Sequence, residues 1–91
     1  MMFRCEKVIL DDGSIGWKII PEEGVDLKKF NKAVEHLHSW TAGEVTIAAR
    51  KDYAIAYNEF GDMDKELLRR AINMIKSRMK ELEDEVLFFE V

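Results

Sequence analysis

The sequence predicts an α+β domain, a two-layer sandwich in which a mainly antiparallel sheet of four or five strands carries two helices on one face. Three observations support this. Residues 62–91 form a long amphipathic run without Gly or Pro, residues 27–40 form a shorter one, and segments of alternating polarity precede both. Apolar residues every three or four positions are typical of helices, and strict alternation is typical of strands. The expected order is ββαββα, with a final strand as one interpretation of the C-terminal residues.

The bulk composition fits one folded domain spanning residues 1–91. Hydrophobic residues make up 47% and charged residues 35%, which argues against disorder. No apolar run approaches the roughly 18 residues of a membrane span, and the first residues lack an apolar signal core. The lone cysteine, Cys5, has no partner for an internal disulfide. We therefore expect a cytoplasmic protein with no membrane partner.

Each predicted helix follows a predicted hairpin. Asp12-Gly13 joins the strands of the first hairpin, and Pro21 ends the second of these strands. Asp26 is placed to cap the first helix, which we expect to end near Gly43. The apolar positions of that helix are Leu27, Phe30, Val34, Leu37 and Trp40.

The second hairpin consists of residues 44–50 and 53–58, joined by a turn too short for any other connection. Alternation in these strands separates large apolar residues from small ones. We assign Val45, Ile47, Tyr53 and Ile55 to the side that faces the helices. The other side then carries small, weakly apolar residues, namely Thr46, Ala48, Ala54 and Ala56.

The last helix begins at Asp62 or Asp64, but its end is ambiguous. Its apolar stripe comprises Leu68, Ile72, Ile75, Met79, Leu82, Val86 and Phe89. Five acidic residues among positions 81–91 are unfavourable at a helix C-terminus, and residues 86–89 are continuously apolar. We favour a strand for this tail. A helical continuation is the alternative.

The predicted order leaves a conflict over one edge of the sheet. From Trp17 onward, βαββαβ matches a ferredoxin-like plan. Strand one and the tail would then both lie beside the Trp17 strand, and only one of them can. The predicted core is Phe3, Ile9, Trp17, Ile19, Leu27, Phe30, Val34, Leu37, Val45, Ile47, Tyr53, Ile55, Leu68, Ile72, Ile75 and Met79.

No residue pattern indicates an enzyme. His36 and His38 lie about 200° apart on a helix, so they cannot clasp one metal ion. Cys5 has the sequence context of a buried apolar group, and the serines lack a nucleophile elbow. We expect no catalytic, cofactor-binding or metal-binding residues and no cofactor.

The sequence instead predicts a protein-interaction module that forms a homodimer, with assembly into a larger protein complex as a further expectation. The alanine-lined sheet face and the apolar tail each carry more apolar surface than is usual where a protein faces water. The predicted interface residues are Ala48, Ala54, Ala56, Val86, Leu87, Phe88 and Phe89.

The alternative function is nucleic-acid association through a basic helix face. Residues 27–80 carry eleven basic and seven acidic groups, although the net charge of the chain is −4. A basic surface on two neighbouring helices suits a phosphate backbone, but no aromatic residues interleave with it. The residues of this face are Lys28, Lys29, Lys32, Arg69, Arg70 and Lys76.

The start of the last helix carries a short pattern, with Asp64, Leu68-Arg69 and Asn73 spaced as Asp-x3-Leu-Arg-x3-Asn. This spacing resembles the last helix of the small dimerising subunit of the KEOPS tRNA-modifying complex. The resemblance covers about ten residues, and the first hairpin and the acidic tail depart from that family. It implies a non-catalytic, dimerising accessory subunit of a tRNA-modification complex.

Overall fold

A computed structural model describes residues 3–38, 45–59 and 61–90, with side chains omitted for residues 38 and 83–90. Within these residues the order is ββαββα, which confirms the predicted two-layer α+β class. The elements are β1 (Phe3–Ile9), β2 (Ile15–Pro21), α1 (Leu27–His38), β3 (Thr46–Ala49), β4 (Ala54–Tyr57) and α2 (Lys65–Glu90). Trp40 and Gly43, expected in and after the first helix, lie outside the described residues.

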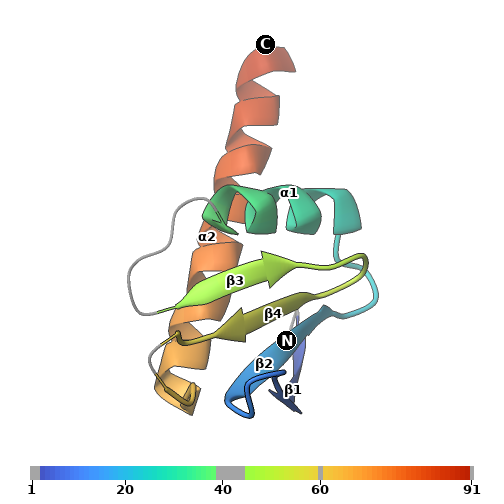
Figure 1. Ribbon diagram of the computed structural model, residues 1–91. Coiled ribbons are helices and arrows are strands. Elements are labelled where there is room, and N and C mark those ends of the chain that lie inside the picture. The colour runs from blue at the N-terminus through green and yellow to red at the C-terminus, as the bar shows by residue number, and fades with distance from the viewer. Residues whose placement is uncertain (1–2, 39–44, 60, 91) are drawn as a thin grey trace.

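The sheet is fully antiparallel and has the strand order β1-β2-β4-β3 (Figure 1). Helix α2 runs behind the sheet, and α1 crosses α2 above β3 (Figure 1). β1 therefore occupies the edge beside β2, which contains Trp17. The competition predicted for this edge is resolved in favour of the N-terminal strand.

The C-terminal tail is helical, so the predicted strand is wrong. α2 continues without interruption from Lys65 to Glu90. With β1 already paired to β2, a tail strand has no position on that edge. The apolar spacing that runs from Leu68 to Leu82 also continues through Val86 and Phe89. Helical periodicity outweighs the unfavourable placement of acidic residues near the helix end.

Both β-hairpins have turns that follow from their sequences. In the first, Gly13 has a φ of 87°, its N–H donates to the Leu10 carbonyl, and the Leu10 N–H donates to the Ser14 carbonyl at 2.8 Å. Glycine reaches this left-handed conformation without a steric penalty. In the second hairpin, the Arg50 N–H donates to the Tyr53 carbonyl at 2.9 Å, leaving a turn of two residues.

This two-residue turn fixes which residues of the second hairpin face the helices. It pairs Ile47 with Ala56 and Ala48 with Ile55. Paired residues lie on the same face of a sheet. Ile47 and Ala56 are both buried in the helix-covered core, so Ile55 lies on the open face. Assigning Tyr53 and Ile55 to the core was therefore wrong, and both are half-buried on the open side.

Aspartates cap both helices. The Asp26 carboxylate accepts the Lys29 N–H at 3.1 Å, and the Asp64 carboxylate accepts the Leu67 N–H at 2.9 Å. Each bond satisfies a backbone donor that the first helical turn leaves unpaired. Asp26 was predicted as a cap, and of the two residues predicted to begin the last helix, Asp62 and Asp64, it is Asp64 that caps it.

The core lies between the helices and one face of the sheet. Its largest fully buried side chains are Phe30, Ile19, Ile47, Ile75 and Val34, all predicted core residues. Two other predictions are wrong, because Ile9 is 80% exposed and Leu27 is 45% exposed. Ile9 is the last residue of β1, and Leu27 is the first residue of α1. Side chains at the ends of elements extend past the surface that covers the rest.

Candidate functional site

The alanine face predicted as an interface does not exist as a surface. Ala54 and Ala56 are 0% exposed and pack in the core beneath the helices. Their small side chains fill the space between the sheet and the helical layer. Ala48 does lie on the open face with Ile55, but only 8% of it is exposed. Of these three alanines, Ala54 and Ala56 are therefore unavailable to a partner.

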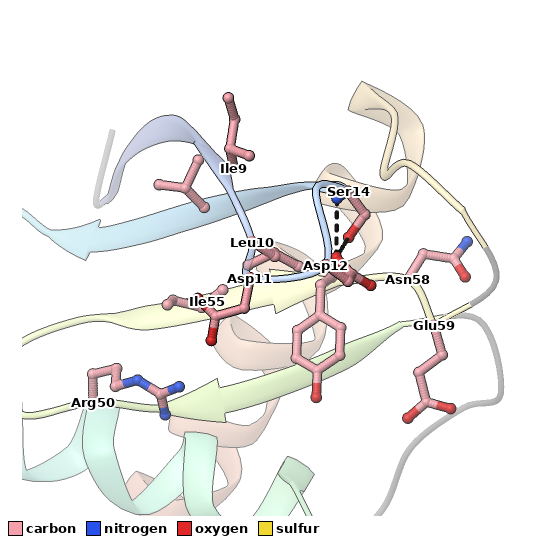
Figure 2. Close-up of a pocket in the computed structure, with 11 residues that line it drawn as sticks. Ile9, Leu10, Asp11, Asp12, Ser14, Arg50, Ile55, Asn58 and Glu59 are labelled. Atoms are coloured by element: carbon pink, nitrogen blue, oxygen red, sulfur yellow. Dashed lines mark hydrogen bonds between the residues drawn. The ribbon is translucent and has the colours of Figure 1, made fainter.

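The open face of the sheet carries a pocket of about 560 Å³. Val8, Leu10, Ile55 and Tyr57 provide apolar lining, while polar groups surround them. Figure 2 shows the β1–β2 loop, with Asp11 and Asp12, above β4, and Arg50 and Glu59 at opposite ends of the pocket. The sequence gives no signal for this pocket, because it forms where a loop curls over a sheet distant in sequence.

Two of the three pocket carboxylates already serve the fold. Asp12 accepts the Ser14 hydroxyl at 2.6 Å and the Ser14 N–H at 2.9 Å. These hydrogen bonds hold the pKa of the Asp12 carboxyl below its usual range. Glu59 accepts the Thr46 hydroxyl at 3.3 Å. Asp12 and Glu59 thus have structural roles, in the β1–β2 turn and at the β3 edge of the sheet, which account for their positions in the pocket.

The start of α2 is fastened to β2. The Asp62 carboxylate accepts the Ile15 N–H at 2.9 Å, and the Met63 N–H donates to the Ile15 carbonyl at 3.1 Å. The indole N–H of Trp17 donates to the Met63 carbonyl at 2.9 Å. Three hydrogen bonds therefore fix where α2 begins and, together with the core contacts, its direction.

The six predicted basic residues occupy two arms, one on α1 and one on α2, with Lys32 and Lys76 nearest to the crossing of the helices. The helices meet where Arg78 Nη2 lies 2.8 Å from His36 Nδ1. Lys28 on α1 and Arg70 on α2 each precede this crossing by eight residues, or about 12 Å along each helix axis. Figure 1 shows that the two helices run in different directions from the crossing. The predicted set divides into Lys28, Lys29 and Lys32 on α1 and Arg69, Arg70 and Lys76 on α2.

The basic arm of α2 is exposed along its length. Arg69, Arg70 and Lys76 are exposed, as are Lys65 and Lys80. Arg69 forms an ion pair with Glu66 at 3.6 Å, but its side chain remains 73% exposed. Such pairs contribute little in water, so the positive charge remains accessible to a binding partner.

The tail of α2 extends past the rest of the fold. Leu82 is 7% exposed and belongs to the core cluster. Residues 83–90 add about 12 Å of helix beyond it. In Figure 1 these turns rise past α1 toward the C-terminus. The backbone of the predicted interface residues Val86, Leu87, Phe88 and Phe89 is helical, and their side chains lie outside the described residues.

Groups with intrinsic reactivity are engaged in the fold. Cys5 is half-buried in β1, and burial raises the pKa of its thiol. His36 contacts Arg78, whereas the His38 side chain lies outside the described part of the chain. Where side chains are described, no three His, Cys, Asp or Glu residues gather as metal ligands would.

Two residues of the Asp64-Leu68-Arg69-Asn73 pattern, Asp64 and Leu68, have structural roles. Asp64 caps α2, Leu68 is buried in the core, and Arg69 and Asn73 are exposed.

Comparisons with protein-family models, curated proteins and solved structures found no match for this chain. Within the described residues, neither helix is long and apolar enough to cross a membrane.

Proposed function

We propose that this protein is a non-enzymatic interaction module that works as a homodimer, with the C-terminal turns of α2 forming the contact. One observation carries the proposal: α2 continues for eight residues after Leu82, its last described core residue. Those residues include four consecutive apolar ones, Val86 to Phe89. Apolar groups of this number on a projecting helix favour burial against a partner.

The energetics of an isolated helix end strengthen the proposal. Helix stability in proteins comes mainly from packing of an apolar face. The acidic residues among positions 81–90 interact unfavourably with the helix dipole at this end. Packing of the tail against a second copy would supply stabilisation that offsets this unfavourable interaction. Two identical tails suit a two-fold dimer, in which each chain gives and receives the same contact.

Light scattering coupled to size-exclusion chromatography tests the proposal. The full chain should elute with about twice its 10.6 kDa mass, and a chain ending at Glu85 should elute as a folded monomer. The matched control is Ile9→Ser, which replaces an 80% exposed apolar residue on the sheet and should leave the dimer intact. A full chain that remains monomeric at about 100 μM would rule out the proposal. Its dimer dissociation constant would then be too high for a protein that works as a dimer.

The second candidate function is nucleic-acid association, and the exposed basic arm of α2 favours it. Residues 65–80 carry six basic groups and one acidic group. Phosphate contacts of this kind are sequence-independent and weaken steeply with salt. Residues 65–80 contain no aromatic residue that could stack on bases among these basic groups. We therefore rank this function second.

Fluorescence anisotropy with labelled DNA and tRNA at about 50 and 200 mM salt tests the second function. Arg69→Glu, Arg70→Glu and Lys76→Glu combined should abolish any binding without unfolding the chain. Arg4→Glu with Lys51→Glu is the control, because both residues are exposed on the sheet side. Absence of binding by the unmodified protein at the lower salt would eliminate this function.

A further inference from the structure

We infer that the two α2 helices of the dimer pair antiparallel, so that the acidic tail of each copy lies against the basic arm of the other. This inference rests on the proposed homodimer and adds the orientation and the contacting residues. It starts from the distribution of charge along α2. Residues 65–80 have six basic groups and one acidic group, whereas residues 81–90 have five acidic groups and none basic. The two segments carry net charges of +5 and −5.

One chain cannot bring these two segments together. α2 is a single helix from Lys65 to Glu90, so its tail cannot fold back on its own beginning. Arg70 and Glu83 are thirteen residues apart, which is about 20 Å along the axis and beyond the screening length of about 8 Å at physiological salt. The ion pair between Arg78 and Glu81, at 2.7 Å, joins neighbouring turns across the boundary between the two segments. Basic residues near the start of α2 can therefore meet the acidic tail only in a second copy of the chain.

Charge also selects among dimer geometries. Parallel α2 helices would place basic arm against basic arm and acidic tail against acidic tail. A contact confined to the two tails would oppose five carboxylates with five more. The antiparallel arrangement with overlap along the whole helix is the one that places each basic arm against an acidic tail.

Helical spacing identifies a seam for this pairing. Arg69, Ile72 and Lys76 follow one another at intervals of three and four, and Glu83, Leu87 and Glu90 repeat the intervals in reverse order. Ile72 is half-buried beside the core, with exposed Arg69 and Lys76 on either side of it in sequence. The seam thus presents an apolar position between two basic ones on the arm, and an apolar position between two acidic ones on the tail.

An antiparallel two-fold brings these positions into register. With the axis near residues 79 and 80, Arg69 lies opposite Glu90 of the other copy, Ile72 opposite Leu87, and Lys76 opposite Glu83. Each chain contributes both partners, so every pairing occurs twice. The seam therefore combines an apolar contact with two opposite-charge contacts at each end of the dimer.

Two complementary variants, Lys76→Glu and Glu83→Lys, provide the test. Each alone places like charges opposite each other at two symmetric sites, so each should raise the dimer dissociation constant at least about tenfold. Mixed together, the two variants should form a heterodimer, because acidic residues 76 and 83 of one chain meet two lysines of the other. Light scattering of each variant alone and of the equimolar mixture measures this. Lys28→Glu on α1 is the matched control and should dimerise normally.

The outcomes separate this inference from the function on which it rests. Dimers of both single variants with unchanged affinity would overturn the antiparallel pairing while leaving the homodimer proposal standing. A monomeric unmodified chain would overturn both. Weakened single variants that do not rescue each other on mixing would also overturn the pairing, because opposite-charge contact between positions 76 and 83 is its central claim. Circular dichroism of each variant confirms that the chain remains folded.

Discussion

Trp17 of β2 donates its indole N–H to the backbone carbonyl of Met63, one residue before the Asp64 cap of α2. This 2.9 Å bond joins residues 46 positions apart. Because the carbonyl lies beside the first turn of α2, the bond fixes the helix start against the sheet. The direction of the projecting tail thus depends on a tryptophan in the first hairpin.

Replacing Trp17 with Phe should lower the free energy of unfolding by about 1 kcal/mol, since a part-buried carbonyl loses its donor while most of the apolar ring remains. Urea denaturation followed by circular dichroism measures the change. Lys7→Ala is the control, because it removes the cation 5.6 Å from the same ring and keeps the hydrogen bond. An effect of Lys7→Ala equal to that of Trp17→Phe would mean that the hydrogen bond contributes nothing specific.

Gly16 is required where β2 lies close beside β4 in the sheet. A Cβ on Gly16 would lie 2.9 Å from the Ala56 carbonyl oxygen, a backbone atom that cannot simply rotate away. Gly16→Ala should therefore destabilise the fold by about 1–3 kcal/mol. Gly61→Ala is the control, because its added Cβ would meet no atom within 4 Å. Equal midpoints for the two variants in thermal unfolding would contradict the close approach at Gly16.

The register of the second hairpin predicts opposite tolerance at two adjacent residues. Ala54 is fully buried in the core, whereas Ile55 is half-buried on the open face. Ala54→Glu should cost about 3 kcal/mol or more, because it introduces an uncompensated charge beneath the helices. Ile55→Glu should leave a folded protein. Soluble expression and two-dimensional NMR of both variants test the register, which fails if Ile55→Glu unfolds the chain and Ala54→Glu does not.

The same two residues show what the sequence could and could not reveal. Alternation correctly separated Ala54 from Ile55, but side-chain size suggested the wrong side for each. A two-residue turn at Lys51 and Asp52 places Ile55 opposite Ala48, and that register alone would have corrected the assignment. The caps, the first hairpin and the helical stripes were predictable because each depends on residues close in sequence. The pocket and the bond between Trp17 and Met63 depend on contacts between distant segments.

The tail illustrates the same distinction. Apolar spacing through Val86 and Phe89 already allowed a helix, whereas the acidic residues around them argued for a strand. The decision depended on whether β1 or the tail occupied the edge beside β2, which is a property of the whole sheet. Patterns among neighbouring residues do not determine the strand order of the sheet, so they could not decide between a helix and a strand for the tail.

The hydrogen bonds from Ser14 predict a pH effect at the first turn. They lower the pKa of Asp12 in the folded state, so the stability they provide is present above the pKa of the unfolded carboxyl and is lost as the pH falls through the folded value. Ser14→Ala should move the Asp12 pKa upward in an NMR titration of the carboxyl carbon. The stability difference between the unmodified chain and Asp12→Ala should shrink as the solution is acidified. Asp11→Ala is the control, and an equal acid dependence of both aspartate variants would contradict this role for Asp12.

The helical conformation of the tail predicts how substitutions at Glu83, the first residue after Leu82, will affect the protein. Proline inside a helix removes one backbone hydrogen bond and clashes with the preceding turn. Glu83→Pro should therefore reduce the helical signal at 222 nm, and under the proposed function it should also shift the protein from dimer to monomer. Glu83→Ala removes the same carboxylate but keeps the helix, so it should retain the full helical signal. Because all the described core contacts of α2 come from Leu82 and the residues before it, both variants should keep the folded domain. Equal helical signals for Glu83→Pro and Glu83→Ala would show that residues 83–90 are not helical in solution.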